Sequence, residues 1–280
     1  MIDDYRKEAA DRLKEDLPPL PLTAKQTAEL ITLLKSPPIK DTEALMALFC
    51  HRVPSGVDQA AYIKAAYLTD IAKGVEKSSI ISPKYAIELL GTMVGGYNVQ
   101  SLISLLDSDF ADEVVKALSH IILIFDAFHD VSEKVKSGNK AAMRLMESWA
   151  NGDWFLKKSA LSNEIKVLVF KVDGETNTDD LSPAQEAWSR PDIPLHAKAM
   201  LMNKMPNGIK TIQDLKTRRL PIAYVGDVVG TGSSRKSAIN SVQWHMGNDI
   251  PYIPNKRTGG IILGSKIAPI FFNTAEDSGA

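Results

Sequence analysis

The spacing of apolar residues changes near residue 161, and this change limits the chain to folds that combine two kinds of domain. Before that point, apolar residues recur at three- and four-residue steps, as on one face of a helix. After it, β-branched residues gather in short runs bounded by glycine or proline, as in strands. The sequence therefore predicts an all-helical domain over residues 1–160, followed by a mixed α/β domain over residues 161–280.

The first domain carries clear signals for the starts and ends of helices. Thr23 and Gln26 have the spacing of a capping box, and Ser82 followed by Pro83 fits an N-cap with proline at the first helical position. The two prolines after Ser36 end the helix that begins at Thr23. About six to eight helices joined by short loops predict an α-solenoid or a helical bundle.

The second domain has three strand-like runs separated by helical patterns. The runs lie at 165–172, 220–226 and 259–264, and the helical patterns lie at 194–203, 211–219 and 235–244. Strands that alternate with helices predict an α/β fold.

Composition excludes several classes of function from this chain. The 280 residues are 44% hydrophobic, and the formal net charge of -1 favours neither nucleic acid nor an anionic membrane. Cys50 is the only cysteine, so the chain can form neither an internal disulfide nor a cysteine cluster for zinc or iron-sulfur. The N-terminus is acidic, unlike a signal peptide, and no apolar run approaches the roughly 20 residues of a membrane span. We therefore expect a cytoplasmic protein.

A glycine-rich segment, GDVVGTGSSRKSA at 226–238, is typical of an anion-binding turn. It is not a dinucleotide fingerprint, because Arg235 replaces the third glycine, and it lacks the spacing of a P-loop. A strand ending near Val225 and a helix beginning near Ser234 would still direct free backbone N–H groups at one point. The alternative is a plain glycine turn in which Ser233 or Ser234 caps the helix and Arg235 is solvated.

A second polar loop, at 174–197, follows the first predicted strand and is rich in threonine, aspartate and serine. Its arginine, Arg190, stands directly before a proline. Taken alone, a loop of this composition is more often a turn with side-chain caps, and Arg190 more often a surface residue.

Together the two segments resemble the swivel domain of aconitases, which are iron-sulfur hydro-lyases that interconvert citrate and isocitrate through cis-aconitate. The resemblance rests on TNTDDLSP, WSRPDIP, GDVVGTGSSRKSA and NKRTGGIILGSKIAPIFFNT. A helical, HEAT-like domain precedes them, opening with YRKEAADR and containing AIELLGTMVGGYN. This order of domains is similar to the bacterial aconitase B type, also called aconitate hydratase 2 or 2-methylisocitrate dehydratase.

The resemblance implies roles for individual residues. Ser233 would be the base that removes the proton next to a substrate carboxylate, and Ser234 would contact a substrate oxygen. Arg190 and Arg235 would each hold a carboxylate, and Arg235 would also support the Ser233 alkoxide. Because a serine hydroxyl is a very weak base, such a role needs cations and a helix N-terminus nearby.

Further expectations come from the same resemblance. Asp179 and Ser182 would support the substrate-binding residues without contacting the substrate themselves. The family's [4Fe-4S] cluster would lie on other domains of the full-length enzyme, because Cys50 sits alone in an apolar helix. The chain would then be an N-terminal fragment, inactive alone, whose swivel domain is incomplete at its C-terminus. Its partners would be the cluster-binding domains, a second copy bound through the helical domain, or mRNA, and no membrane.

Three hypotheses for function stay open on the sequence alone. The first is a part of an aconitate hydratase that binds citrate, isocitrate and cis-aconitate, with 2-methylisocitrate left undecided. The second is an interaction module for protein or RNA. The third is a small-subunit-like swivel protein of the isopropylmalate isomerase type, against which the helical domain argues.

Overall fold

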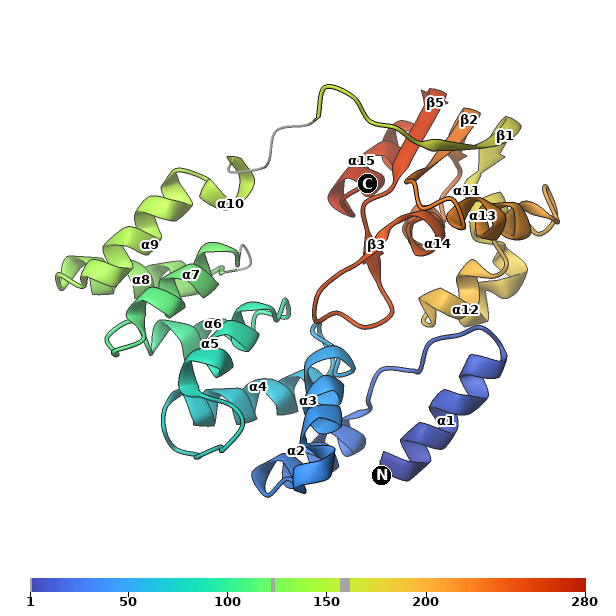
Figure 1. The fold of residues 1–280 in the computed structure, drawn as a ribbon. Helices are drawn as coiled ribbons and strands as arrows, with labels where there is room; N and C mark the ends of the chain where they lie inside the picture. Colours follow the sequence, from blue (N-terminus) through green and yellow to red (C-terminus); the bar gives the residue numbers. More distant parts are fainter. Residues whose placement is uncertain (1, 122–123, 157–161) are drawn as a thin grey trace. The chain divides into compact units, whose positions relative to one another are not determined.

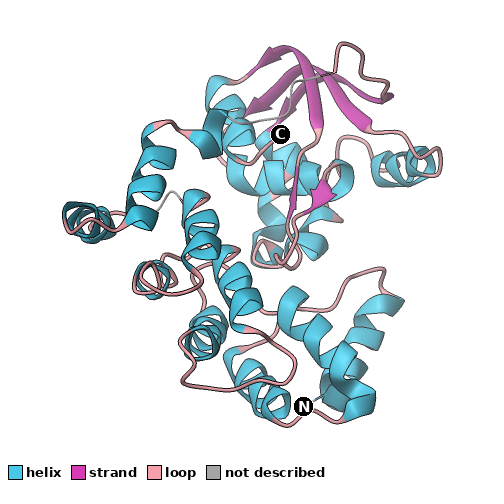
Figure 2. Ribbon diagram, turned by 60° about the vertical axis from the view of Figure 1, so that its left-hand side comes forward, coloured by secondary structure: helices cyan, strands magenta, loops and turns pink. Residues whose placement is uncertain are grey.

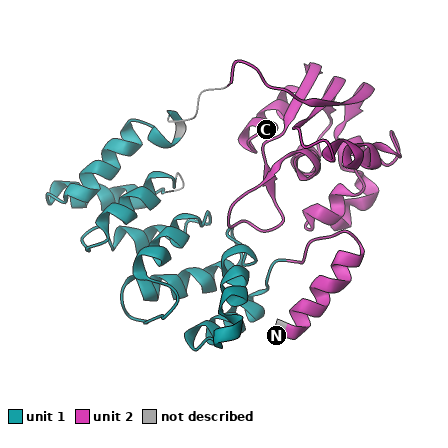
Figure 3. Cartoon of the chain, viewed as in Figure 1, with its two compact units in different colours: residues 1, 21–161 teal, residues 2–20, 162–280 magenta. Residues whose placement is uncertain are grey.

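A computed structural model describes residues 2–121, 124–156 and 162–280 (Figure 1). By their contacts these residues form two compact units (Figure 3). Unit 1 comprises the described residues of 21–161, and unit 2 comprises 2–20 together with 162–280. Helix α1 (Ile2–Lys14), which the sequence pattern grouped with the helical domain, therefore packs within unit 2.

In the residues that the structure describes, unit 1 consists of helices joined by loops and turns, without a strand. Together with α1, ten α-helices precede residue 157 in the described ranges, more than the predicted six to eight. The difference arises from short helices such as α6 and α10, which hold too few residues to show a helical period. The helices of unit 1 are α2 (Ala24–Lys35), the 3-10 helix η1 (Ile39–Asp41), α3 (Thr42–His51), α4 (Gln59–Ala72), α5 (Pro83–Gly91), α6 (Val99–Ile103), α7 (Ala111–Ser119), α8 (Ala127–Lys136), α9 (Lys140–Ala150) and α10 (Asp153–Leu156).

The predicted helix signals are confirmed. Gln26 N donates to Thr23 Oγ1 at 3.3 Å, and Thr23 N donates to Gln26 Oε1 at 2.9 Å, which completes the capping box. Tyr85 N donates to Ser82 Oγ at 3.2 Å, and Pro83 is the first residue of α5. Each cap satisfies backbone N–H groups that would otherwise lack a partner at the helix start.

The helices of unit 1 pack mainly against their near neighbours in sequence. Helix α2 contacts α3 and α4, α4 contacts α5, α5 contacts α7, and α7 contacts α9. Helices α5 and α7 can approach closely because Gly91 of α5 has no side chain. A Cβ at Gly91 would lie 2.8 Å from the Cβ of Ala117 in α7. The described helices of unit 1 are thus joined mainly by contacts between helices that are one or two apart in chain order.

Unit 2 is built on a parallel sheet, drawn in magenta in Figure 2, and its strands lie in the order β1-β2-β5 (Figure 1). The three predicted strands are present, each beginning and ending later than its predicted run, as β1 (Leu168–Asn177), β2 (Ile222–Thr231) and β5 (Ile261–Ile267). The prediction that the second strand ends near Val225 is wrong, because Val228 and Val229 continue to pair with both neighbours. The other elements are α11 (Thr178–Leu181), the 3-10 helix η2 (Ala184–Ser189), α12 (Ile193–Ala197), α13 (Gly208–Lys216), α14 (Arg235–Met246), the antiparallel pair β3 (Asn248–Asp249) and β4 (Arg257–Thr258), and α15 (Pro269–Asp277).

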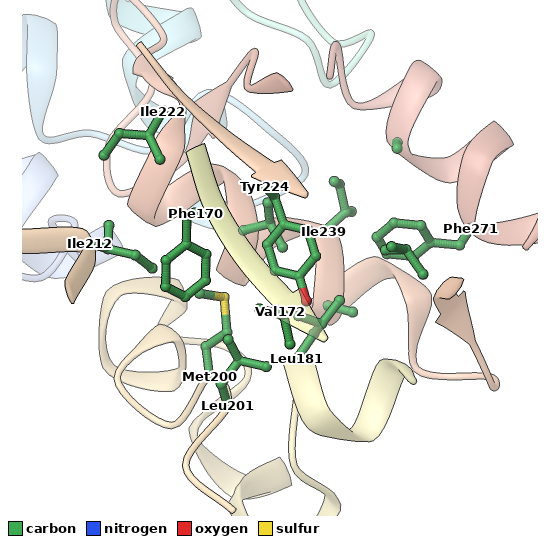
Figure 4. Close-up of a cluster of buried hydrophobic side chains, with 14 residues drawn as sticks. Phe170, Val172, Leu181, Met200, Leu201, Ile212, Ile222, Tyr224, Ile239 and Phe271 are labelled. Atoms are coloured by element: carbon green, nitrogen blue, oxygen red, sulfur yellow. The ribbon is translucent and has the colours of Figure 1, made fainter. Parts of the chain in front are cut away.

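One face of the sheet forms the core of unit 2 with the helices (Figure 4). The strand register places Phe170, Tyr224 and Ile262 in one row across the three strands. The rings of Phe170 and Tyr224 lie 5.9 Å apart between centroids, and Ile239 of α14 and Phe271 of α15 belong to the same cluster. This cluster fixes the C-terminal end of β2 against α14 and α15.

The described residues therefore combine a helix-rich unit with a small parallel sheet and its helices, an α plus α/β architecture. In the parts of the chain covered by the structure, no helix has both the length and the apolar character needed to span a bilayer.

Candidate functional site

The turn between β2 and α14 depends on two glycines in the left-handed region. Gly230 has φ 84° and Gly232 has φ 104°. A Cβ at Gly230 would lie 2.2 Å from Phe271 Cγ, and one at Gly232 would lie 2.5 Å from Thr178 Oγ1. The two glycines thus let the turn lie directly against α15 on one side and α11 on the other.

Ser234 is the central residue of this turn. It occupies the N-cap position of α14, but its side chain makes no capping hydrogen bond. Instead, Ser234 N donates to Thr178 Oγ1 at 3.1 Å and Ser234 Oγ donates to Asp179 Oδ1 at 3.4 Å. Arg190 Nη2 in turn donates to Ser234 Oγ at 3.1 Å. The sequence left open that this serine only caps the helix. Its contacts are instead with Thr178, Asp179 and Arg190.

A cavity of about 300 Å³ opens at the turn. Arg190, Arg235 and Lys236 contribute three cationic side chains to its lining, and α14 directs its N-terminus toward the same residues. Arg190 Nε is buried and has no hydrogen-bond partner among the residues that the structure describes, and Arg235 Nη1 lies 3.5 Å from Ser233 O. The remaining lining residues are Ser233, Ser234 and Ser237. The three positive charges and the helix N-terminus together favour an anionic occupant.

A buried polar cluster lies behind this cavity. Ser182 Oγ lies 2.7 Å from both His196 Nε2 and Ser237 Oγ. On the other side of the ring, His196 Nδ1 lies 2.8 Å from Ser189 Oγ and 3.1 Å from Glu186 O. Burial, assisted by the nearby positive charge of Arg190, lowers the pKa of His196 below its usual value of 6.5, so the ring is neutral at pH 7.

The structure brings the predicted site residues together from two segments about 50 positions apart in sequence. Arg190 from the polar loop at 174–197 meets Ser233, Ser234 and Arg235 of the glycine turn at one cavity. Asp179, an exposed carboxylate, contacts the turn directly through Ser234.

Ser182 does not reach the cavity, since it is fully buried and contacts the site through Ser237. Reasoning from sequence missed Thr178, His196, Lys236 and Ser237. Lys236 and Ser237 directly follow Arg235 and could have been included by position along the first helical turn. His196 gave no signal, because a single histidine in a helical pattern has many structural uses.

The residues of this chain do not fit an iron-sulfur cluster. Cys50, the sole cysteine, is 4% exposed in unit 1, and its Sγ lies 3.3 Å from Tyr85 Oη. Within the described ranges, no three histidine, cysteine, aspartate or glutamate side chains are grouped so as to hold a metal ion. A cluster of four irons needs several thiolates.

Two family models match successive parts of the chain. The family model described as the aconitate B N-terminal domain matches residues 4–155, and the model described as the aconitate hydratase 2 N-terminus matches residues 167–280. The chain belongs to the aconitate hydratase B family.

Individual relatives in this family match the chain over its whole length. Aconitate hydratase B of Synechocystis sp. is 60% identical over 283 residues, which cover 100% of this chain and 32% of the relative. The Escherichia coli protein of the same name is 57% identical, with 34% of it covered, and the Helicobacter pylori protein is 51% identical, with 33% covered. The chain thus spans about a third of the length of the curated relatives it matches.

Proposed function

We propose that this chain supplies the serine base and the carboxylate-binding residues of an aconitate hydratase that interconverts citrate and isocitrate through cis-aconitate. The observation that carries the proposal is the hydrogen bond from Arg190 Nη2 to Ser234 Oγ at 3.1 Å. The guanidinium that makes it comes from the polar loop at 174–197 and lines the cavity of the glycine turn. Family membership supports the reaction, and the cavity supports the class of substrate.

The charges of the cavity match those of a tricarboxylate. A guanidinium can hold a carboxylate through two parallel hydrogen bonds, and Arg190 and Arg235 both line the cavity. Arg190 reaches the turn through Nη2, and its guanidinium has further N–H donors for a carboxylate oxygen. Lys236 adds a third cation, so each of three carboxylates has a positive partner within one site.

Ser233 is the proposed base. It lines the cavity and is exposed, so a substrate can approach its hydroxyl. In its alkoxide form Ser233 Oγ takes the proton from the carbon next to a carboxylate, and the electron pair of the broken C–H bond moves toward that carboxylate. The N-terminus of α14 and the cations of Arg235 and Lys236 stabilise negative charge at both places.

The chain alone is expected to show no turnover. The family resemblance assigns the [4Fe-4S] cluster to other domains, and Cys50 by itself is no ligand set for one. On the same basis we interpret unit 2 as the swivel domain and unit 1 as a HEAT-like domain. The neighbour-to-neighbour packing from α2 to α9 supports the second interpretation. Self-association through unit 1, binding of mRNA and a cytoplasmic location stay predictions.

A chimeric enzyme tests the proposal. Residues 1–280 would replace the matching third of Synechocystis aconitate hydratase B, and Ser233→Ala would be compared with the unsubstituted chimera. We expect kcat to fall by about 10²–10⁴-fold, the range for loss of a positioned acid or base. Affinity for citrate should change little. Ser265→Ala, at an exposed serine of β5, serves as the control. A near-normal kcat in Ser233→Ala would remove Ser233 as the base.

A further inference from the structure

One buried histidine, His196 of α12, joins separate segments of the candidate site from behind. It is 2% exposed. Its Nδ1 lies 2.8 Å from Ser189 Oγ, and Ser189 directly precedes Arg190 in the chain. Its Nε2 lies 2.7 Å from Ser182 Oγ, at the residue that ends α11. The ring therefore bridges the Arg190 segment and the segment that carries Thr178.

The bridge continues to the glycine turn. Ser182 Oγ lies 2.7 Å from Ser237 Oγ in the first turn of α14. Ser237 Oγ also lies 3.1 Å from Ser234 O. Two hydroxyl groups thus connect the imidazole to the backbone of Ser234, whose side chain accepts a hydrogen bond from Arg190 on the cavity side.

Counting protons shows how the ring is held. Glu186 O is a carbonyl oxygen and can only accept, and it lies 3.1 Å from His196 Nδ1, so Nδ1 carries the proton. The groups that face the ring are the cation of Arg190, the carboxylate of Glu186 and the hydroxyls of Ser182 and Ser189. In the neutral ring, Nε2 accepts the proton of Ser182, and the single proton of Ser237 then goes either to Ser182 Oγ or to Ser234 O.

From this arrangement we infer that His196 is a positioning residue for the carboxylate site, which fixes Arg190 relative to the Ser234 turn. Nδ1 acts through Ser189 on the Arg190 side, and Nε2 acts through Ser182 and Ser237 on the turn side. The inference rests on the proposed function of this cavity. It adds a residue that touches no substrate and that the resemblance did not indicate.

Three substitutions of His196 test its hydrogen bond to Ser189 separately from its hydrogen bond to Ser182. His196→Phe keeps a ring of similar size and removes both nitrogens. The amide of His196→Asn can reach the Ser189 side as a donor, and the amide of His196→Gln can reach Ser182 as an acceptor. A merely space-filling role predicts that Phe replaces histidine best. A positioning role predicts that the two amide variants retain more function than Phe.

Two measurements on the 280-residue chain provide the readouts. The first is the Kd for tricarballylate, a tricarboxylate without a hydroxyl group, followed through the amide NMR signals of residues 233–237. The second is the NMR order parameter of the Arg190 Nε–H group. For His196→Phe we expect a Kd about ten-fold higher, as for the loss of one net hydrogen bond, and a lower order parameter. For His196→Asn and His196→Gln we expect a Kd and an order parameter between those of His196→Phe and the wild type.

The controls keep each outcome decisive. His245 is also buried in unit 2 and lies 2.8 Å from Ala197 O through Nε2, so His245→Phe tests for the loss of any buried histidine. It should lower stability and leave both readouts unchanged. An unchanged Kd and order parameter in folded His196 variants would overturn the inference. If the wild-type chain does not bind tricarballylate, the proposed function fails, and the Arg190 order parameter still decides the role of His196.

Discussion

Arg12 of α1 and Asp192 at the N-cap of α12 form a two-pronged ion pair across 180 residues of sequence. Nη1 lies 2.8 Å from Oδ2, and Nη2 lies 3.2 Å from Oδ1. The side chains are only 15% and 16% exposed. Asp192 stands two residues after Arg190, and Leu195 N donates to its Oδ1 at 3.4 Å. The first helix of the chain is thereby attached to the segment that presents Arg190.

Arg12→Ala should destabilise unit 2 and weaken the carboxylate site together. The substitution leaves Asp192 partly buried without its cation, and we expect the free energy of unfolding to fall by about 2 kcal/mol, within the range for hydrogen bonds to charged groups. Denaturation by urea, followed by a probe in unit 2, measures this loss.

The matched control lies on the same helix. Lys14 pairs with Asp11 at 2.7 Å, but these side chains are 74% and 60% exposed, so Lys14→Ala should cost less than about 0.5 kcal/mol. Equal effects of Arg12→Ala and Lys14→Ala would show that α1 is not held through Asp192.

Gly232→Ala should damage the turn for two separate reasons. Its φ of 104° is unfavourable for any side chain, and the added Cβ would lie 2.5 Å from Thr178 Oγ1. Gly174 has φ 73° with no atom within 4 Å of an added Cβ, so Gly174→Ala measures the cost of conformation alone. We expect Gly232→Ala to cost about 2 kcal/mol more than Gly174→Ala in thermal unfolding, the order of cost for an overpacked contact. A difference near zero would mean that the turn does not need its contact with α11.

Because Lys64 is buried, we expect the stability of unit 1 to depend on pH. Lys64 is 1% exposed, its Nζ lies 3.4 Å from Cys50 O and 5.1 Å from the centroid of the Phe49 ring, and burial lowers its pKa from 10.5 to about 8. Above pH 10.5 the amine of Lys64 is neutral in both the folded and the unfolded chain, so its ionisation does not change the free energy of unfolding. As the pH falls from 10.5 to 8, the unfolded chain binds the proton and the folded chain does not. Below pH 8 the loss of stability caused by the lowered pKa of Lys64 has reached its full size.

Lys64→Met should therefore stabilise unit 1 at pH 7 by up to about 3 kcal/mol, because each pKa unit corresponds to about 1.4 kcal/mol. The gain should shrink when urea unfolding is repeated at pH 9.5. Lys73→Met, at an exposed position at the end of the same helix, should change stability little at either pH. A gain in Lys64→Met that is independent of pH would point to packing rather than to the buried charge.

Local signals in the sequence predicted the elements of the fold well. The Thr23 capping box and the Ser82-Pro83 start involve residues three positions apart or closer, so they can be recognised without tertiary structure. The strand at 222–231 was found from its β-branched run, but its end was misplaced, because pairing with two neighbours extends it through Gly226. Tertiary pairing of this kind is not visible in a local pattern.

The candidate site was only partly predictable. Arg190, Ser233 and Arg235 were proposed from the family resemblance, and their meeting at one cavity depends on a fold that spacing alone does not specify. The attachment of α1 through Arg12 and the bridge made by His196 join residues far apart in the chain, and neither follows a repeating pattern. Contacts of this kind appear only in the folded structure.

The central claim is that Arg190 grips a carboxylate at the Ser234 turn, and binding of tricarballylate to Arg190→Lys tests it most directly. Lysine keeps the positive charge but cannot form the two parallel hydrogen bonds of a guanidinium. By isothermal titration of the chimeric enzyme we expect a Kd at least about ten-fold higher than that of the unsubstituted chimera. Arg218→Lys, at an exposed arginine beyond α13, should bind normally. An equal Kd for Arg190→Lys and the unsubstituted chimera would contradict the account.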